Sequence, residues 1–485
     1  MLTPAPQAEI FVLRRLKFSC FAGSKQTFRE SHMNPALSLR LCAFARALFF
    51  LFTFASLCLS QQSSRVVVEL RSSLPLKGAA GVAFAPVTKL LAVRQKDATI
   101  RIIDVTDSRE RASLVLTNKA PAIMIWTADG QRLLIASSKA VTIWDARLGK
   151  ELAAPLAIKP PKDFLSVVEM TWSPTGNAIL GFERDDSFKA SLLDKEKTTV
   201  RVWSVESGQI LLRTNLTGLY GRAQFSPNGK QLLTTSDLEG ARLWDVQTGR
   251  LIASLKSGRS WFRQGSWGAF SPDGKTVAVQ SYAGGIHLWD CATGALNASL
   301  ALEENNDYVL REFSPDGKML AIYTERFKGW DIVTSIELRD SVTGELKSTL
   351  TGKNMRDSDS QRVWSADSQT YVTGGGSNSK KFEAKIWDVK TGQLKATFPM
   401  LLTYSRIPFD FGFKDRDSLS VHPTLPVISA SNNKFVRFWS SETGELMQTI
   451  EDTGPATWSA DGTLLLTYAK DLQVAHVWRV VLQDS

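Results

Sequence analysis

Acidic side chains recur at two fixed points of this sequence, and carboxylates are common groups for acid–base catalysis and for holding metal ions. One series lies in a turn sequence and includes Asp273, Asp316 and Asp461. The other directly follows a tryptophan and includes Asp145, Asp245, Asp290 and Asp388. Because an active site is needed only once, this repetition predicts a structural role for both series.

The histidines and the cysteine of the same region do not form a recognisable catalytic or metal-binding pattern. His287 and His476 each stand two residues before a tryptophan, where other units have Arg or Lys, so the position is a generic polar one on a strand. His422 stands in a degenerate turn, and Cys291 occupies a variable turn position. No G-x-S-x-G sequence is present, and Gly374–Gly376 is not followed by the Lys-Ser/Thr of a phosphate loop. We therefore expect a protein that is not an enzyme and binds no cofactor or metal.

The acids belong to a repeat that is visible when 270–294, FSPDGKTVAVQSYAGGIHLWDCATG, is set beside 225–249, FSPNGKQLLTTSDLEGARLWDVQTG. Nine units align. The F/W-S-P-D-G landmark lies around Phe84, Trp126, Trp172, Phe225, Phe270, Phe313, Trp364, Val421 and Trp458. The W-D landmark lies at Ile103, Trp144, Trp203, Trp244, Trp289, Arg339, Trp387, Trp439 and Trp478. A period just above 40 residues is typical of stacked or circular repeat architectures.

Each unit reads as four short antiparallel strands. In the fifth unit Thr276–Gln280 and Ile286–Trp289 are β-rich, Pro272–Gly274 predicts a tight turn, and another apolar run follows the turn at Ala292–Gly294. One such sheet cannot bury both faces, so neighbouring units must pack on it.

The recurring F-S-P-D-G-K…L-W-D…T-G resembles the WD-repeat (WD40) β-propeller family over roughly residues 65–485. The resemblance implies an all-β fold, a single closed propeller of nine four-stranded blades, acting as a binding platform without enzymatic activity. An eight-bladed ring with one degenerate unit is the alternative. The strand-like stretch 65–71 belongs to no unit, and the ninth unit has only three strands. We expect 65–71 to complete the last blade and close the ring.

The sequence also departs from the family. No unit has a Gly-His pair, and the turn Asp of the family is seen at Asp97 but replaced in most other units. We therefore expect that the Asp-His-Ser/Thr-Trp hydrogen-bond network of the family does not form and that packing holds the blades. Arg339 replaces a tryptophan, which predicts a weak point in the sixth blade.

The first sixty residues are interpreted separately. Arg46, the apolar run 47–59 and the small residues of Cys58-Leu59-Ser60 have the form of a secretory signal peptide. We assign 33–60 to the signal peptide and 61–485 to the propeller, and we expect translation to start at Met33, so that 1–32 is an N-terminal extension assigned in error. This places the protein in a secreted or periplasmic location. The alternatives are an anchor formed by 41–60 and a cytoplasmic scaffold. Without 1–60 the net charge falls from +10 to +5, which argues against a nucleic-acid partner.

Long insertions fall on the loops expected at one end of the ring: 157–166, 183–199, 257–264, 323–335, 374–383 and 399–418. Several combine aromatic and basic residues, which dominate binding hot spots. The predicted partner-binding residues are Trp261, Phe262, Arg263, Phe327, Trp330, Tyr404 and Arg406. The leading function is thus protein–protein recognition by an exported, non-catalytic scaffold. The alternative for these loop residues is that the loops fold over the ring and bury their own aromatic side chains. The alternative function is that of an enzyme, or of a protein that binds a sugar or another small molecule, in the central funnel.

Overall fold

The computed structural model describes residues 65–483 except 117–121, 138–140, 153–169, 185–196, 218–220, 237–238, 256–266, 282–284, 301–305, 329–330, 353–360, 376–381, 401–417, 433 and 470–472. The predicted extension and signal peptide, 1–60, lie outside the described residues. The described chain forms nine four-stranded antiparallel sheets, the blades of a β-propeller. Within the described ranges no helix is long and apolar enough to span a membrane.

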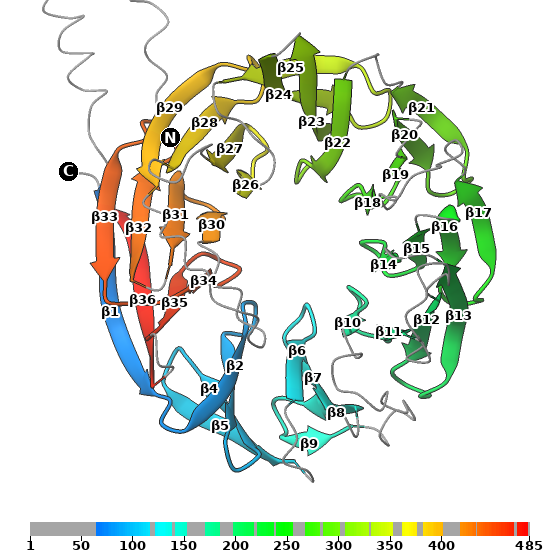
Figure 1. Ribbon diagram of the computed structural model, residues 1–485. Helices are drawn as coiled ribbons and strands as arrows, with labels where there is room; N and C mark the ends of the chain where they lie inside the picture. The colour runs from blue at the N-terminus through cyan, green and yellow to red at the C-terminus, as the bar shows by residue number, and fades with distance from the viewer. Residues whose placement is uncertain are drawn as a thin grey trace, which may run out of the picture. The chain divides into compact units, whose positions relative to one another are not determined.

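Blades 1 to 8 each contain four strands in chain order from the inner to the outer edge of the ring (Figure 1). Blades 1 to 3 contain β2 (Ala79–Ala85), β3 (Leu90–Gln95), β4 (Thr99–Asp104) and β5 (Arg109–Val115); β6 (Ala122–Trp126), β7 (Arg132–Ser137), β8 (Val141–Asp145) and β9 (Lys150–Glu151); and β10 (Met170–Trp172), β11 (Ala178–Arg184), β12 (Lys197–Ser204) and β13 (Ile210–Thr217). Blades 4 to 6 contain β14 (Arg222–Phe225), β15 (Gln231–Ser236), β16 (Gly240–Asp245) and β17 (Leu251–Leu255); β18 (Trp267–Phe270), β19 (Thr276–Ser281), β20 (Gly285–Asp290) and β21 (Leu296–Leu300); and β22 (Asn306–Phe313), β23 (Met319–Lys328), β24 (Asp331–Asp340) and β25 (Leu346–Thr351). Blades 7 and 8 contain β26 (Gln361–Trp364), β27 (Thr370–Gly375), β28 (Phe382–Asp388) and β29 (Leu394–Met400); and β30 (Ser418–Val421), β31 (Val427–Ser431), β32 (Phe435–Ser440) and β33 (Leu446–Glu451).

Blade 9 joins the two ends of the described chain. It contains β34 (Ala456–Trp458), β35 (Leu464–Tyr468) and β36 (Val474–Gln483), and its outer strand is β1 (Arg65–Pro75). β1 and β36 pair antiparallel from Arg65 opposite Gln483 to Pro75 opposite Val474, with an irregularity after Leu70. The predicted closure by 65–71 is confirmed, and the eight-bladed alternative is wrong.

The core lies between the blades, where each sheet buries its faces against its neighbours. Between blades 4 and 5, for example, Leu233 and Leu255 pack with Val277, Val279 and Trp289. Tryptophans at the first landmark also connect blades through hydrogen bonds. The indole N–H of Trp126 donates to the carbonyl of Ala83 on blade 1 at 2.9 Å, and that of Trp172 donates to Ile125 on blade 2 at the same distance. An aromatic landmark therefore fills the seam and links adjacent inner strands.

The repeated acids build turns. Ser271 Oγ donates to Asp273 Oδ1 at 2.6 Å, and the same carboxylate oxygen accepts the Lys275 N–H at 3.0 Å. In the outer turn, Asp290 Oδ1 accepts the Thr293 hydroxyl at 2.7 Å and its N–H at 2.8 Å, and these bonds hold the pKa of Asp290 below its usual value. Repetition predicted a structural role for the carboxylates, and at these positions they stabilise turns through hydrogen bonds.

We expected no Asp-His-Ser/Thr-Trp hydrogen-bond network, but the link between threonine and tryptophan does form in three blades. In blades 4, 7 and 9 the indole N–H of the W-D tryptophan donates to a threonine on the neighbouring strand. The pairs are Trp244 to Thr234 at 2.8 Å, Trp387 to Thr373 at 3.0 Å and Trp478 to Thr467 at 2.9 Å. The hydroxyl-to-indole link does not need a Gly-His pair, because both partners come from the same hairpin.

Candidate functional site: blade 6 and its seam with blade 7

Most of the predicted binding residues lie outside the described residues: Trp261, Phe262, Arg263, Trp330, Tyr404 and Arg406. Phe327 lies on β23, where it pairs with Ile332 of β24. The segments that carry the other six join the second to the third strand of a blade, or one blade to the next. In antiparallel blades both kinds of connection leave from one end of the strands, opposite the tight Ser-Asp and Thr-Gly turns. The positions of the described strand ends are thus compatible with the prediction that these segments lie at one end of the ring.

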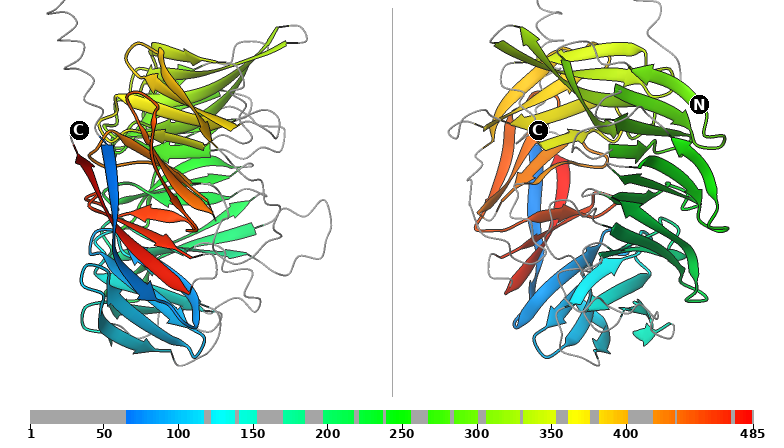
Figure 2. Two further views of the ribbon diagram at one scale, coloured as in Figure 1. Left: turned by 90° about the vertical axis from the view of Figure 1, so that its left-hand side faces the viewer. Right: turned by 45° about the vertical axis from the view of Figure 1, so that its right-hand side comes forward.

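Blade 6 differs from the other blades in the length of its middle hairpin. β23 and β24 have ten residues each. They pair without interruption, from Met319 opposite Asp340 to Lys328 opposite Asp331. The inner strand β22 pairs with β23 only as far as Arg326. Figure 2 shows the end of this hairpin reaching beyond the neighbouring strands. We call the paired residues 326–328 and 331–333 the arm.

The arm corrects the expectation that 323–335 is a loop insertion. The residues continue the β23–β24 ladder, so the insertion lengthens two strands. The run Ile332-Val333-Thr334 explains this locally, because consecutive β-branched residues favour an extended backbone. A strand pair holds its end in a more defined position than a loop of equal length.

An ionic cluster lies at the base of the arm. Glu337 is only 2% exposed and accepts from Arg339, with Nη2 to Oε2 at 2.7 Å and Nε to Oε2 at 2.8 Å. Arg326 of the arm approaches the other carboxylate oxygen at 3.4 Å. The charge of Arg339, which replaces the usual tryptophan, is therefore compensated within the same strand. Whether blade 6 is a weak point stays a prediction.

A second ionic and aromatic cluster lies where blade 6 meets blade 7. Tyr371 occupies a position that is aliphatic in every other blade, facing the aromatic landmark across the first hairpin. The aliphatic residues are Leu91, Leu133, Ile179, Leu232, Val277, Leu320, Ile428 and Leu465. The hydroxyl of the fully buried Tyr371 donates to Glu312 Oε1 of blade 6 at 3.1 Å. Glu312 itself is half-buried, and burial raises its pKa despite this bond.

A bulge brings a cation to the same seam. The β22–β23 register shifts between Leu310 and Glu312, so Arg311 is the extra residue of the inner strand. The guanidinium of Arg311 lies 5.3 Å from the ring centroid of Tyr323. Burial first, and then repulsion by Arg362 of blade 7, lower the pKa of Arg311 to about 10. Groups with perturbed pKa values that converge in one place are candidates for function, although ionic seams also perturb them.

An exposed aromatic side chain lies farther along the inner strands. Trp267, the first residue of β18, is 39% exposed, and the guanidinium of Arg222 on β14 lies 4.2 Å from its ring centroid. Trp267 follows the segment with Trp261, Phe262 and Arg263 by only a few residues. The sequence prediction did not include Trp267. It could have been noticed because no other unit has a tryptophan three residues before the first landmark.

The histidines have structural contacts. His287 Nδ1 lies 2.8 Å from Ser299 Oγ, and His476 Nδ1 lies 3.0 Å from Ser73 Oγ, each across to the outer strand. His422 Nδ1 accepts the N–H groups of Thr424 and Leu425, whereas the serine at this turn position in blade 5, Ser271, accepts the N–H of Thr276. Among the residues that the structure describes, no group of three or more His, Cys, Asp or Glu is placed to hold a metal.

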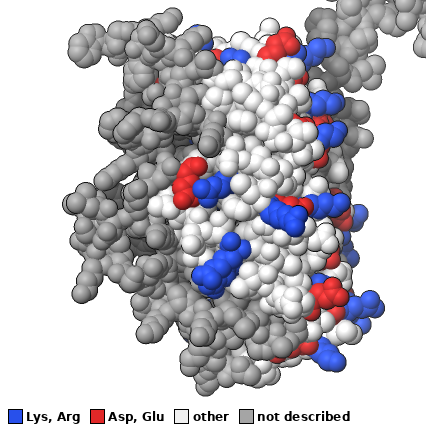
Figure 3. All heavy atoms as spheres, turned by 90° about the vertical axis from the view of Figure 1, so that its right-hand side faces the viewer, with Lys and Arg blue, Asp and Glu red and all other residues white. Residues whose placement is uncertain are grey.

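The outer surface has little charge segregation on the side shown in Figure 3. Most of this face is uncharged, and its basic and acidic side chains are interspersed. Neither sign forms a broad patch in the described part of this view.

Comparisons with known proteins identify the fold but not a family. No protein-family model matches the chain, and no curated protein sequence matches it. The crystal structure of the eukaryotic initiation factor is similar, with a TM-score of 0.55 and 14% identity over 82% of this chain and 97% of that chain. A computationally designed protein, Ika8, is similar with a TM-score of 0.43 and 15% identity over 84% of this chain and 98% of its own. The first of these similarities supports the propeller fold alone.

Proposed function

We propose that this chain is a divergent WD-repeat propeller that serves as a non-catalytic platform for a protein partner outside the cytoplasm. The family assignment rests on the two landmarks, which recur at equivalent turns and strands of the nine blades. The non-catalytic role is supported by the use of the repeated acids, such as Asp273 and Asp290, in local turns. An interaction platform is also compatible with the propeller fold.

The observation that carries the platform role is the arm of blade 6. Nothing in the repeat requires this hairpin to extend past its neighbours, and a longer free hairpin adds exposed backbone without closing the ring. Its base is fixed by Glu337 between two arginines. The arm carries Phe327, and Trp330 lies in its connection. Aromatic residues are enriched in the hot spots of protein interfaces.

Shortening the arm tests this role. Arg326 and Val333 face each other in the ladder, so residues 327–332 can be replaced by Asn-Gly, the preferred two-residue hairpin turn. The shortened chain should keep its melting temperature and lose most of its capacity to capture a partner from the native extract. The matched control is Lys318→Gln in the tight turn at the opposite end of blade 6, which should change neither quantity. A shortened chain that is stable and binds as well as the wild type would contradict the platform role of the arm.

Export is supported by the apolar run 47–59 and the small residues before Gln61. Material recovered outside the cytoplasm should begin at or near Gln61 when its N-terminus is sequenced. An intact 33–60 on exported material would favour the anchor, and recovery only from the cytosolic fraction would favour the cytoplasmic scaffold.

A further inference from the structure

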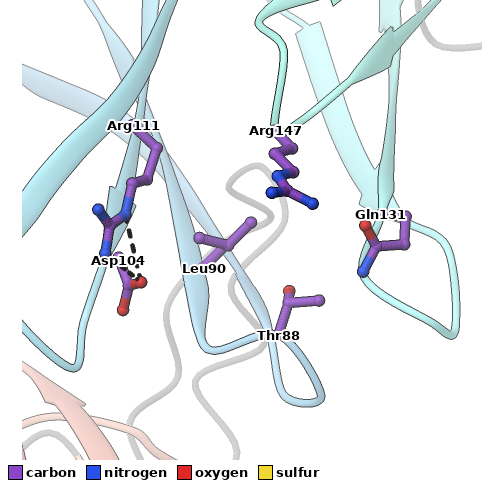
Figure 4. A pocket seen from close by; sticks show the side chains of 6 residues that line it. All are labelled: Thr88, Leu90, Asp104, Arg111, Gln131 and Arg147. Atoms are coloured by element: carbon purple, nitrogen blue, oxygen red, sulfur yellow. Dashed lines mark hydrogen bonds and ion pairs between the residues drawn. The ribbon is translucent and has the colours of Figure 1, made fainter.

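A pocket of about 520 Å³ lies between blades 1 and 2, at the end of the blades that carries the tight turns. Its lining residues are Thr88, Leu90, Asp104, Arg111, Gln131 and Arg147. In Figure 4, Arg111 and Arg147 lie on opposite sides of Leu90, with Thr88 and Gln131 beside them. This volume is within the range of small-ligand sites, and the lining combines one apolar side chain, Leu90, with five polar or charged ones.

The pocket coincides with a departure from the repeat in blade 1. Ala85 and Val87 stand where blade 5 has Ser271 and Asp273, so this turn lacks the usual carboxylate. The turn closes instead with a hydrogen bond from the Lys89 N–H to the carbonyl of Ala85 at 2.8 Å. The Lys89 ammonium pairs with Asp461 of blade 9 at 2.7 Å. The turn therefore contributes Thr88 to the pocket but no charge.

Arg111 is held in place by acids of its own blade. Its Nη2 donates to Asp104 Oδ2 at 2.8 Å and to Asp107 Oδ2 at 2.6 Å, and its Nε donates to Asp104 at 3.3 Å. These bonds orient the guanidinium and balance its charge. Arg111 thus shapes one wall of the pocket.

Arg147 forms the other wall and belongs to the outer turn of blade 2. Its backbone N–H donates to Asp145, which fixes the turn, while its side chain is exposed. No ion pair of Arg147 occurs among the residues that the structure describes. The positive charge that faces the pocket without a counter-charge on its walls is therefore that of Arg147.

We infer that this pocket binds a small monocarboxylate, with the carboxylate at Arg147 and the apolar body of the ligand over Leu90. The Gln131 amide can donate a hydrogen bond beside this charge, whereas the Thr88 hydroxyl already donates to the Gly130 carbonyl at 3.1 Å and forms part of the wall. Arg111 is already paired with Asp104 and Asp107, so Arg147 supplies one uncompensated positive charge, which matches a monoanion better than a dianion such as phosphate. A carboxylate of this kind occurs at the C-terminus of a peptide and in a sugar acid. The site is separate from the blade 6 arm and does not depend on the platform role.

Titration of the full chain with two acids and their neutral amides tests the site and separates the sources. N-acetylleucine represents a peptide C-terminus and glucuronate a sugar acid, with N-acetylleucinamide and glucuronamide as the neutral counterparts. We expect saturable millimolar binding of at least one acid and little binding of its amide. The acid that binds more tightly identifies the source.

Two variants assign the binding to the pocket. Arg147→Gln should weaken acid binding about tenfold, the effect of losing one charge-assisted hydrogen bond. Lys390→Gln changes the equivalent position of the outer turn in blade 7, two residues after Asp388, and should leave binding unchanged. Both substitutions are at turn surfaces, so melting temperatures should stay at the wild-type value. No saturable binding of either acid, equal binding of the amides, or equal losses in the two variants would overturn the inference.

Discussion

The hydroxyl of Tyr371 in blade 7 donates a 3.1 Å hydrogen bond to the carboxylate of Glu312 in blade 6. Both residues depart from the types found at their positions in blade 1, where Ala83 and Leu91 stand. Two departures that meet across a seam compensate for each other, because a buried hydroxyl without an acceptor is destabilising. The seam between blades 6 and 7 is therefore specified by a polar pair as well as by packing.

Restoring the blade 1 residue types tests this pair. Tyr371→Leu should lower the free energy of unfolding by about 1–3 kcal/mol, because Glu312 loses its donor and the ring volume is partly vacated. Combining it with Glu312→Ala should cost less than the sum of the single changes, by about 1–2 kcal/mol. Denaturant unfolding of the four proteins measures the coupling. Additivity within about 0.5 kcal/mol would show that the two residues act independently.

His422 predicts a pH-dependent stability. It is buried, its Nε2 lies 2.8 Å from the Gly462 carbonyl of blade 9, and its Nδ1 accepts two backbone N–H groups. This arrangement requires the neutral ring, and burial lowers the pKa of His422 below its ordinary value of 6.5. As pH falls, the unfolded chain takes up the proton first, so stability that is present above 6.5 is lost as pH falls through the folded-state pKa.

The control for this titration is His422→Ser, the residue type found at the same turn position in blade 4 at Ser226. Unfolding free energies measured from about pH 8 down to about pH 5 should fall more steeply for the wild type than for the variant. Parallel pH profiles would show that His422 does not contribute to the acid sensitivity of the ring.

Two glycines of blade 4 with a positive φ predict a second difference in stability. Gly249 has a φ of 67°, and an added Cβ would lie 2.6 Å from the Leu211 carbonyl of blade 3. Gly240 also has a positive φ, 78°, but its nearest neighbour would be 4.0 Å away. Gly240→Ala should cost about 1 kcal/mol for the left-handed backbone, and Gly249→Ala roughly 1–3 kcal/mol more. Equal losses in thermal unfolding would mean that the turn does not need this close approach to the next blade.

Much of the ring could be predicted from the sequence because its pattern is repeated. The landmarks at Phe270 and Trp289 recur often enough to predict nine blades with eight as the alternative, and the unpaired stretch 65–71 was expected to complete the three-stranded ninth unit. The structure confirms nine blades and this closure. The structural role of His422 followed from its place in a turn. These inferences depend on local chemistry that is the same in every unit.

The candidate site was harder to predict because it consists of exceptions. The unusual types of Glu312 and Tyr371 are visible in the sequence, but their contact depends on the curvature of the ring between two blades. The length of 323–335 suggested a loop, whereas its β-branched residues continue a ladder. The partner of Arg222, Trp267, is on another blade and has no sequence spacing that identifies it.

Closure of the ring predicts a strong effect of removing β1. A chain that begins at Leu76 would leave β36 without its outer partner and expose a long strand edge, which promotes aggregation. It should lose cooperative thermal unfolding or become insoluble. The matched control is a chain that begins at Gln61, which keeps β1 and should melt as the longer chain does. Unchanged melting of the chain that begins at Leu76 would require closure by another strand.

The most direct measurement of the platform role is partner capture by a variant with Trp261, Trp330 and Tyr404 all changed to Ala, with thermal unfolding recorded on the same sample. If these side chains form the binding face, the melting temperature should stay unchanged and capture should fall more than tenfold, since a hot-spot truncation typically costs at least about 2 kcal/mol. A lowered melting temperature with undiminished capture by the folded fraction would contradict the account and would identify these aromatics as part of the internal packing of the loops.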